Sequence, residues 1–392
     1  GELVQVVEGI QAEFIDAGHL LGSASVRFTC IENGITKTIV FSGDIGNKNQ
    51  PIIRDPQYFF AADYVLTEST YGDRLHDEVP YKNDELAKIF DETFRQGGNV
   101  IIPSFAVGRT QELLYHIREI KEKQLVKSIP DFPVYVDSPL AFEATNIYEC
   151  DMTGYADDET LQVLKAGFRP LYFSNLNLCQ TTQESIALNQ DAAPKVIISS
   201  SGMCEAGRIR HHLKHNLWRK ECAILFVGYQ ANGTLGKMLL DGATQVKLFG
   251  EPIAVKASMH NFAGLSAHAD KNGLLEWINS YKVKPQKVFV VHGEEDTCLA
   301  YTETLKQLGY NAMTANFEME YDLAADVIVQ TGISIDTLME RGEKHKESPA
   351  YGQLEATGQQ LLQLIRQKKG MSNRDIEHLS GQIAALISQL DK

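Results

Sequence analysis

The chain has 392 residues, of which 43% are hydrophobic and 22% charged, a balance that excludes wholesale disorder. This length predicts two or three domains, and no run of about 18 apolar residues predicts a membrane span. The 37 Lys and Arg against 51 Asp and Glu give a formal net charge of −14, which argues against general binding of polyanions. The six cysteines form no CxxC pair, so we expect reduced thiols in a cytoplasmic protein. We also expect no secretory leader and no membrane partner.

Residues 1–74 have the pattern of a β meander. Strand-like runs occur at residues 4–7, 11–15, 25–29, 38–41 and 64–66. Three ionisable residues come just after such runs: His19, Asp44 and Glu68. Strand ends are where rigid scaffolds place functional groups, and the neighbouring glycines permit tight turns.

Residues 75–252 change to strand–loop–helix units. Apolar strands alternate with helices, which predicts a parallel sheet covered on both faces. Three Ser- and Gly-rich loops, two of which contain Ser104 and Ser201, each lead into a helix N-terminus, where free N–H groups favour phosphate. The acidic stretch at residues 149–159 is predicted to be a solvated loop or lid.

A basic helix follows the second of these loops. Residues 207–220 hold five Lys or Arg and three His without one carboxylate, although the whole chain is acidic. A charge run is usually a solvated helix face, but this one adjoins a predicted phosphate loop, which favours a nucleic-acid groove. The predicted contacts are Arg208 and His212, with Arg109 and Lys237 extending the positive strip.

After residue 252 the strand-rich pattern returns. A strand at residues 287–291 runs into His292, which joins His19 and Asp44 as a residue delivered by a strand end. Each alone is an ordinary turn residue, but two imidazoles and a carboxylate together suit Zn, Mn or Fe. His268 precedes a helix, and beside a metal site it is a candidate general acid if Glu68 holds its second ring nitrogen.

The tail from residue 336 has apolar residues at helical spacing behind a predicted cap at Ser372. We expect a helical hairpin there. It either packs on its own domain or forms a homodimer contact, and the sequence leaves the two open.

With these residues in place, the chain resembles β-CASP members of the metallo-β-lactamase-fold nucleases. The resemblance is strongest to bacterial and archaeal relatives of the endonuclease subunit of the cleavage and polyadenylation specificity factor, and it covers about residues 1–335. The matching segments, in the family's order, are Asp16-Ala17-Gly18-His19-Leu20-Leu21-Gly22-Ser23-Ala24, Phe41-Ser42-Gly43-Asp44-Ile45-Gly46, Glu68-Ser69-Thr70-Tyr71-Gly72, Pro103-Ser104-Phe105-Ala106-Val107-Gly108-Arg109, Ser201-Gly202-Met203, Gly228-Tyr229-Gln230, Ser266-Ala267-His268-Ala269-Asp270 and Val291-His292-Gly293.

The resemblance implies an α/β fold with three parts. Residues 1–74 and 253–335 would belong to a metallo-β-lactamase αββα sandwich, the metal domain. Residues 75–252 would form an inserted β-CASP domain with a Rossmann-like parallel sheet, and residues 336–392 a helical tail.

It also implies the chemistry of the site. His19, Asp44 and His292 would bind two zinc ions, with Asp44 bridging them, and His268 would be the general acid, oriented by Glu68. A histidine at the last motif favours single-stranded RNA as the substrate, held in the cleft between the two domains.

The chain departs from the family in one respect. The family places an HxHxDH motif upstream of the segment that matches His19, and no such motif occurs in this sequence. We therefore expect that a missing N-terminal half of the metal domain supplies most ligands of both ions. The leading hypothesis is a zinc-dependent ribonuclease with a two-metal mechanism, active only with that half. The alternative is a non-catalytic RNA-binding or scaffolding chain, and a small-molecule metallohydrolase is less favoured.

Overall fold

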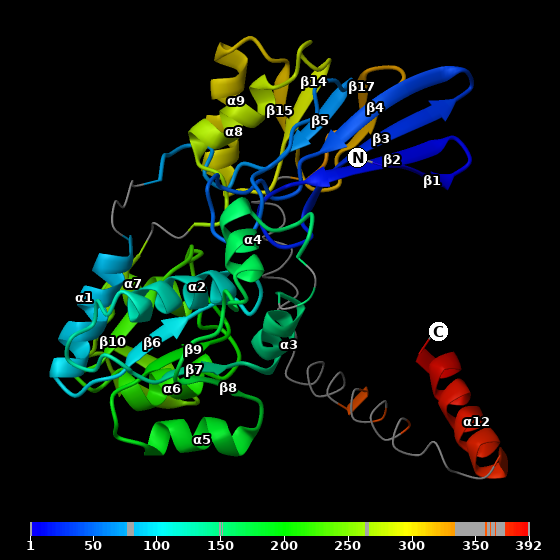
Figure 1. Cartoon of the computed structure of the whole chain (residues 1–392). Helices are drawn as coiled ribbons and strands as arrows, with labels where there is room; N and C mark the ends of the chain where they lie inside the picture. The colour runs from blue at the N-terminus through cyan, green and yellow to red at the C-terminus, as the bar shows by residue number, and fades with distance from the viewer. Residues whose placement is uncertain are drawn as a thin grey trace. The chain divides into compact units, whose positions relative to one another are not determined.

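The computed structural model describes residues 2–76, 82–148, 150, 152–262, 266–333, 357, 358, 361, 365 and 373–390. The chain divides into two compact units, Gly1–Ala315 with Tyr321–Val329, and Asn316–Glu320 with Gln330–Lys392. Two large sheets, each with its own helices, build the first unit (Figure 1). No helix among the described residues is long and apolar enough to cross a lipid bilayer.

Seven strands form one of these sheets. In sheet order they are β1 (Leu3–Val7), β2 (Ile10–Asp16), β3 (Ala24–Glu32), β4 (Ile35–Phe41), β5 (Tyr64–Thr67), β14 (Lys287–Val290) and β15 (Ala312–Thr314). The first four are an antiparallel meander, whereas β5, β14 and β15 continue parallel to β4. Helices α8 (Lys271–Asn279) and α9 (Glu295–Gln307) pack on one face through a core that includes Val65, Trp277 and Tyr301.

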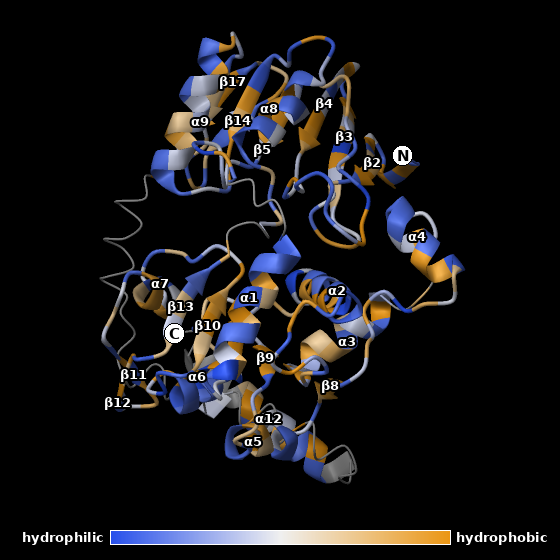
Figure 2. Cartoon of the chain, turned by 60° about the vertical axis from the view of Figure 1, so that its left-hand side comes forward, coloured by the Kyte–Doolittle hydropathy of each residue, from blue (hydrophilic) through white to orange (hydrophobic). Residues whose placement is uncertain are grey.

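Six strands form the other sheet, and every neighbouring pair is parallel. In sheet order they are β13 (Ser258–Asn261), β10 (Ala223–Phe226), β6 (Val100–Pro103), β9 (Val196–Ser199), β7 (Val134–Asp137) and β8 (Leu176–Cys179). Successive side chains enter opposite cores: Ile102 joins the core of α1 (Lys82–Arg95) and α2 (Arg109–Glu122), whereas Ile101 joins that of α6 (Ile209–Asn216). Figure 2 shows hydrophobic residues gathered on β9 and β10 in the middle of this region.

The smaller elements complete the described chain. They are α3 (Pro139–Tyr148), α4 (Asp158–Lys165), α5 (Thr182–Gln190), α7 (Leu235–Leu240), β11 (Gln245–Leu248), β12 (Glu251–Ala254), β16 (Glu320–Asp322), β17 (Val327–Gln330) and α12 (Asn373–Leu390).

The predicted α/β fold with a parallel sheet covered on both faces is confirmed. In the tail α12 is helical as predicted, whereas Ser372 lies outside the described residues. The domain boundaries, and the choice between an internal and a homodimer contact, stay predictions.

The described part of the acidic stretch at residues 149–159 is largely exposed, as predicted for a solvated loop, but two of its side chains are anchored in the core. Among its described residues, Met152 and Ala156 are buried in the core below α1 and α2. Asp157 is the N-cap of α4 and accepts a hydrogen bond from Thr160 N. These contacts hold the stretch at two points, while Asp158 and Glu159 remain exposed.

Candidate active site

One edge of the seven-stranded sheet carries four ionisable residues. His19 follows β2, Asp44 follows β4, Glu68 follows β5 and His292 follows β14. Strands β4, β5 and β14 run parallel to one another. Strand β2 has the same direction, because two antiparallel pairings separate it from β4. The topology therefore brings together the residues that the sequence placed at strand ends.

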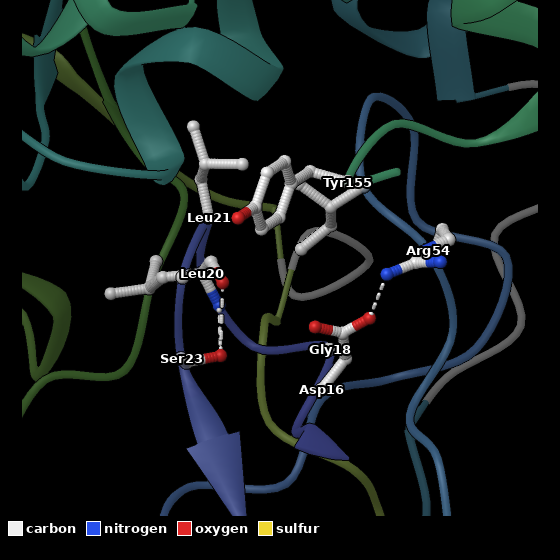
Figure 3. A pocket seen from close by; sticks show the side chains of 9 residues that line it. Asp16, Gly18, Leu20, Leu21, Ser23, Arg54 and Tyr155 are labelled. Carbon is white, nitrogen blue, oxygen red and sulfur yellow. Dashed lines mark hydrogen bonds and ion pairs between the residues drawn. The ribbon is translucent and has the colours of Figure 1, made fainter. Parts of the chain in front are cut away.

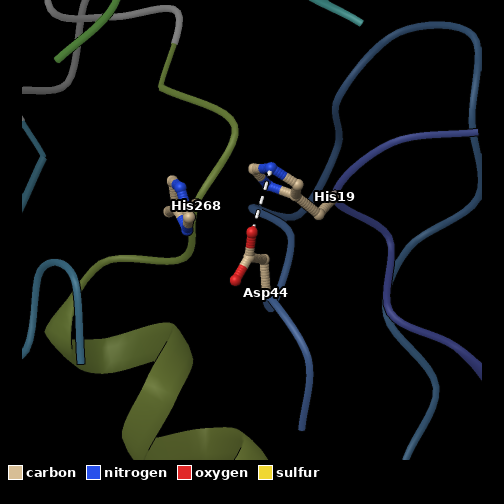
Figure 4. Close-up of side chains that lie close together, drawn as sticks. All are labelled: His19, Asp44 and His268. Carbon is tan, nitrogen blue, oxygen red and sulfur yellow. Dashed lines mark ion pairs between the residues drawn. The ribbon is translucent and has the colours of Figure 1, made fainter. Parts of the chain in front are cut away.

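Asp44 lies between two histidines. Its Oδ2 is 3.8 Å from His19 Nε2, and its Oδ1 is 3.2 Å from His292 Nε2. Each carboxylate oxygen thus faces a different imidazole, which suits a carboxylate that bridges two cations. Figure 4 shows Asp44 with His19 and His268, whose ligand atoms all lie within 4.8 Å of one another.

His268 reaches the same site from the segment that precedes α8. Its ring centroid is 4.3 Å from that of His19, and its Nδ1 lies 3.1 and 3.2 Å from the two carboxylate oxygens of Glu68. Glu68 is 1% exposed and also accepts hydrogen bonds from the backbone N–H groups of Ile45 and Thr70. Burial lowers the pKa of His268, but the hydrogen bond and charge of Glu68 outweigh burial and leave that pKa raised.

These residues fit a zinc site. The 3.8 Å between His19 Nε2 and Asp44 Oδ2 is too long for a hydrogen bond, and is near the roughly 3.4 Å between two ligands of one tetrahedral zinc ion. Burial and the neighbouring His268 lower the pKa of His19, so its imidazole is neutral at neutral pH, the form that binds metal. Imidazole nitrogen and carboxylate oxygen are both ordinary zinc ligands.

The loops that carry His19 and Asp44 touch through their glycines. A Cβ on Gly46 would lie 1.7 Å from the carbonyl oxygen of Gly18, so no larger residue fits there. The backbone N–H of Gly46 also donates to Ala17 O at 2.8 Å. This contact fixes the spacing between the loop of His19 and the loop of Asp44.

The six-stranded sheet presents its predicted contact residues at its own carboxyl edge. Ser104 follows β6 and Ser201 lies just beyond β9, on adjacent strands. Ser104 is buried and its Oγ accepts a hydrogen bond from the hydroxyl of Thr110, whereas Ser201 is half-buried. Lys237 lies on α7 and forms an exposed ion pair with Asp241. Their contacts with a substrate stay predictions.

Arg109 is the member of this set that approaches the cluster of His19, Asp44 and His268. It begins α2, is 7% exposed and forms an ion pair with Glu112. Arg109 and Glu112 line a small cavity together with His19 and Ala267. The positive charge of Arg109 acts against protonation of His268, which places the guanidinium within electrostatic reach of the site.

The structure buries one of the contacts predicted along residues 207–220. His212 is fully buried, with Nε2 2.7 Å from Asp137 Oδ2 and Nδ1 3.0 Å from Asn189 Oδ1. Arg208 also turns toward Asp137, at 2.7 Å. The reason is that Asp137 is itself fully buried, and a buried carboxylate requires charged or hydrogen-bonding partners. His212 therefore cannot contact a substrate, whereas the substrate contact of the partly exposed Arg208 stays a prediction.

Replacing Asp137 by alanine is expected to lower the free energy of unfolding by about 3–5 kcal/mol, because Arg208 and His212 would lose their partner. Burial raises the pKa of the Asp137 carboxyl, but hydrogen bonds, led by that of His212, outweigh it and keep the pKa low and the group charged. Urea unfolding followed by circular dichroism measures the change. Asp241→Ala, in the exposed pair with Lys237, is the matched control and is expected to cost less than about 1 kcal/mol. Equal losses in the two variants would contradict this role of Asp137.

Three residues around the site were given no role from the sequence: His76, Tyr229 and Glu294. His76 Nε2 lies 2.8 Å from the carbonyl oxygen of His268. The hydroxyl of Tyr229, in the loop after β10, donates to Glu294, two residues beyond His292. Tyr229 falls in one of the matching segments, which was a signal for it, whereas nothing in the sequence marks His76.

A second cavity flanks the His19 loop. It is lined by Leu20, Leu21 and Tyr155, and by Arg54, which forms an ion pair with Asp16 (Figure 3). None of the residues around this cavity belongs to the predicted metal-binding or catalytic set. We assign it no chemistry.

Comparisons with known proteins bear on this geometry. Residues 110–239 match the family model described as the Beta-Casp domain, and residues 252–315 match the Zn-dependent metallo-hydrolase RNA specificity domain. A ribonuclease of Thermus thermophilus is 38% identical over 78% of this chain and 67% of its own length. An RNase J-like protein of Methanocaldococcus jannaschii is 32% identical over 77% of this chain and 68% of its own length. The transcription termination factor FttA of the same archaeon is 30% identical over 79% of this chain, which spans about half (49%) of that relative.

Proposed function

Because the chain belongs to the β-CASP family of metallo-β-lactamase-fold ribonucleases, we propose that it forms the larger part of a zinc-dependent enzyme that hydrolyses single-stranded RNA. The observation that carries the proposal is Asp44, each of whose oxygens faces a different imidazole, beside the hydrogen-bonded pair of His268 and Glu68. The matched RNA specificity domain and the ribonuclease relatives support RNA as the substrate.

Each residue of the cluster has a role in this proposal. Zinc ions, when bound, would activate water and neutralise the charge that develops on the phosphate. Asp44 would hold two ions through its two oxygens, with one imidazole, of His19 or His292, on each side. Glu68 fixes Nδ1 of His268, so the opposite ring nitrogen is free to donate a proton to the leaving oxygen. The raised pKa of His268 keeps this proton available near neutral pH.

The proposed enzyme needs more metal ligands than these. Among the described residues, His19, Asp44 and His268 form the one group of three or more side chains whose ligand atoms lie close enough to share an ion. The proposal reserves His268 for proton transfer, so the metal ligands would be His19, Asp44 and His292. These three side chains cannot complete the ligand sets of two tetrahedral zinc ions. We propose that the missing N-terminal half of the metal domain completes both sites and that cleavage requires it.

One face of the seven-stranded sheet supports the need for this second half. The register places Phe14, Val26 and Phe41 side by side across β2, β3 and β4, and Phe28 contacts Phe41 edge to face. Phe14 is 50% exposed and Phe41 39%, whereas the opposite face, which includes Val40, joins the core with α8 and α9. A contiguous exposed apolar surface marks a binding site. We call it the open face and propose that the N-terminal half packs on it.

Phe41→Glu is expected to weaken binding of a separately produced N-terminal half to this chain by about tenfold or more, because docking would bury a carboxylate without a partner. Isothermal titration calorimetry measures the affinity. Thr36→Glu is the matched control, since Thr36 is exposed on the same strand but points to the opposite face. Equal affinities for the two variants would remove the open face from the proposal.

The function itself is tested by cleavage of single-stranded RNA in the presence of zinc. The full-length protein that carries this chain is expected to cut the RNA, and the 392-residue chain alone is not. If the full-length protein binds RNA in a gel-shift assay without cutting it, the alternative of a non-catalytic RNA-binding or scaffolding chain replaces the ribonuclease.

A further inference from the structure

The backbone of His268 is tied to the loop that follows Asp44. Gly46 pairs with His268 in an isolated antiparallel bridge. On either side of this bridge, Asn47 N donates to Ala267 O at 2.9 Å and Ala269 N donates to Ile45 O at 2.8 Å. The position of the His268 ring therefore depends on where this loop lies.

The side chain of Gln50, further along the same loop, adds hydrogen bonds to the contact between this loop and the segment of His268. Its Nε2 donates to Ala267 O at 2.8 Å and to Asn47 O at 3.1 Å. Ala267 O thus accepts two hydrogen bonds from one loop, and Ala267 directly precedes His268. The imidazole of His19 also lies within hydrogen-bonding reach of the Ala267 backbone.

Two residues beyond Gln50, the loop enters the region of the six-stranded sheet. Ile52 and Ile53 are 3% and 9% exposed and belong to the core of α1 and α2. Ile52 N donates to Asp157 Oδ2 and Asp157 N donates to Ile52 O, both at 3.1 Å, while Asp157 also caps α4. The φ of Ile52 is +82°, a conformation that a β-branched residue adopts only where its surroundings hold it.

We infer that Gln50 and Asp157 are positioning residues that couple the packing of the six-stranded region to the placement of His268. The connection runs from Asp157 through Ile52 to Gln50, and from the Gln50 amide to the carbonyl beside His268. Two hydrogen bonds and the short backbone segment between Ile52 and Gln50 make up this connection, so a shift of α4 is expected to displace the His268 ring. This inference rests on the proposed function, because it assigns the coupling to RNA cleavage.

Gln50→Ala in the full-length protein tests the nearer step. We expect kcat for single-stranded RNA to fall about tenfold, with KM and zinc content unchanged, because misplacing a catalytic group acts on the chemical step and not on binding. Gln50→Glu keeps the size of the side chain but lacks the N–H donors, and is expected to show the same fall. Gln57→Ala is the matched control, since Gln57 lies in the same loop but accepts from Asp16 N.

A double-mutant cycle shows whether Gln50 acts through His268. In a His268→Ala background, Gln50→Ala is expected to change kcat by less than about twofold, because the group that it positions is gone. A full tenfold fall in that background, or an unchanged kcat in the single variants, overturns the inference. These outcomes differ from failure of the proposed function, in which the wild-type full-length protein does not cut RNA.

Asp157→Ala tests the remote step. It removes the acceptor for Ile52 N together with the cap of α4, so Thr181→Ala, which removes the cap of the neighbouring helix α5, is the matched control. Both variants are expected to lower Tm, but only Asp157→Ala is expected to lower kcat, by several-fold. Equal kcat values in the two variants would limit Asp157 to capping and contradict the coupling.

Discussion

Asp44→Asn in the full-length protein is expected to lower RNA cleavage by about a thousandfold and to reduce the zinc content at the same time. Asparagine has the size of aspartate but is neutral and offers one carbonyl oxygen where the carboxylate offers two. The two Asp44 oxygens face His19 and His292 separately, so the substitution acts on both ligand pairs. Loss of a Lewis acid worth several kcal/mol corresponds to about three powers of ten in rate.

Two measurements separate this effect from misfolding. Zinc per protein by inductively coupled plasma mass spectrometry is expected to fall in Asp44→Asn, while the circular dichroism spectrum stays that of the wild type. Asp84→Asn, an exposed carboxylate in the first turn of α1, is the control and is expected to keep full zinc and full activity. An Asp44→Asn variant with normal zinc content would contradict the bridging role.

His268→Ala is expected to lower kcat by about a hundredfold to a thousandfold, the usual contribution of a positioned general acid. Zinc content is expected to stay the same, because the proposal gives His268 a proton to donate and no metal to hold. A substrate with a leaving group that needs no proton, such as a p-nitrophenyl phosphodiester, is expected to restore most of the lost rate. Unimpaired cleavage of RNA by His268→Ala would end the general-acid assignment, and His260→Ala on β13 serves as the control.

The pH dependence tests the pairing of His268 with Glu68. Glu68 raises the pKa of His268 through its hydrogen bond and its charge, and a general acid works only in its protonated form. Glu68→Gln removes the charge, so the pKa of His268 falls and activity is lost at a lower pH on the alkaline side. The kcat–pH profile of Glu68→Gln is therefore expected to have its alkaline limb displaced toward acid. If the alkaline limb of the Glu68→Gln profile stays where it is in the wild type, another group supplies the proton.

The strand ends were predictable because their signals are local. Apolar runs stop at His19, Asp44, Glu68 and His292, with glycines beside three of the four, and a sheet edge must gather residues that follow strands of one direction. The distances were not predictable, since they depend on loops such as that of Gly46, whose contact with Gly18 is set by the tertiary fold.

The basic helix shows what the sequence analysis overlooked. Ile209 and Leu213 define the buried stripe of α6, and position 212 lies on that stripe, three residues after the first and one before the second. The helical period alone could therefore have placed His212 inside. Its partner Asp137 could not have been identified, because it is the last residue of β7, 75 residues before His212 in sequence, and only the pairing of β7 with β9 brings the two together.

The loop of Gln50 lies beyond sequence-based prediction for a different reason. It has no periodicity, and its contacts join segments more than 100 residues apart, Asp157 on one side and Ala267 on the other. Only the fold shows that one loop reaches both the proposed catalytic histidine and the core of the six-stranded region.

The most direct measurement of the central claim is zinc-dependent cleavage of a labelled single-stranded RNA by the full-length protein and by its Asp44→Asn variant, followed on a denaturing gel. The proposed site predicts cleavage by the wild type that stops when zinc is chelated and returns when zinc is restored, and a loss of about a thousandfold in the variant. Cleavage at equal rates by the two proteins, or no cleavage by either, would contradict a metal-bridging Asp44 at the centre of a ribonuclease.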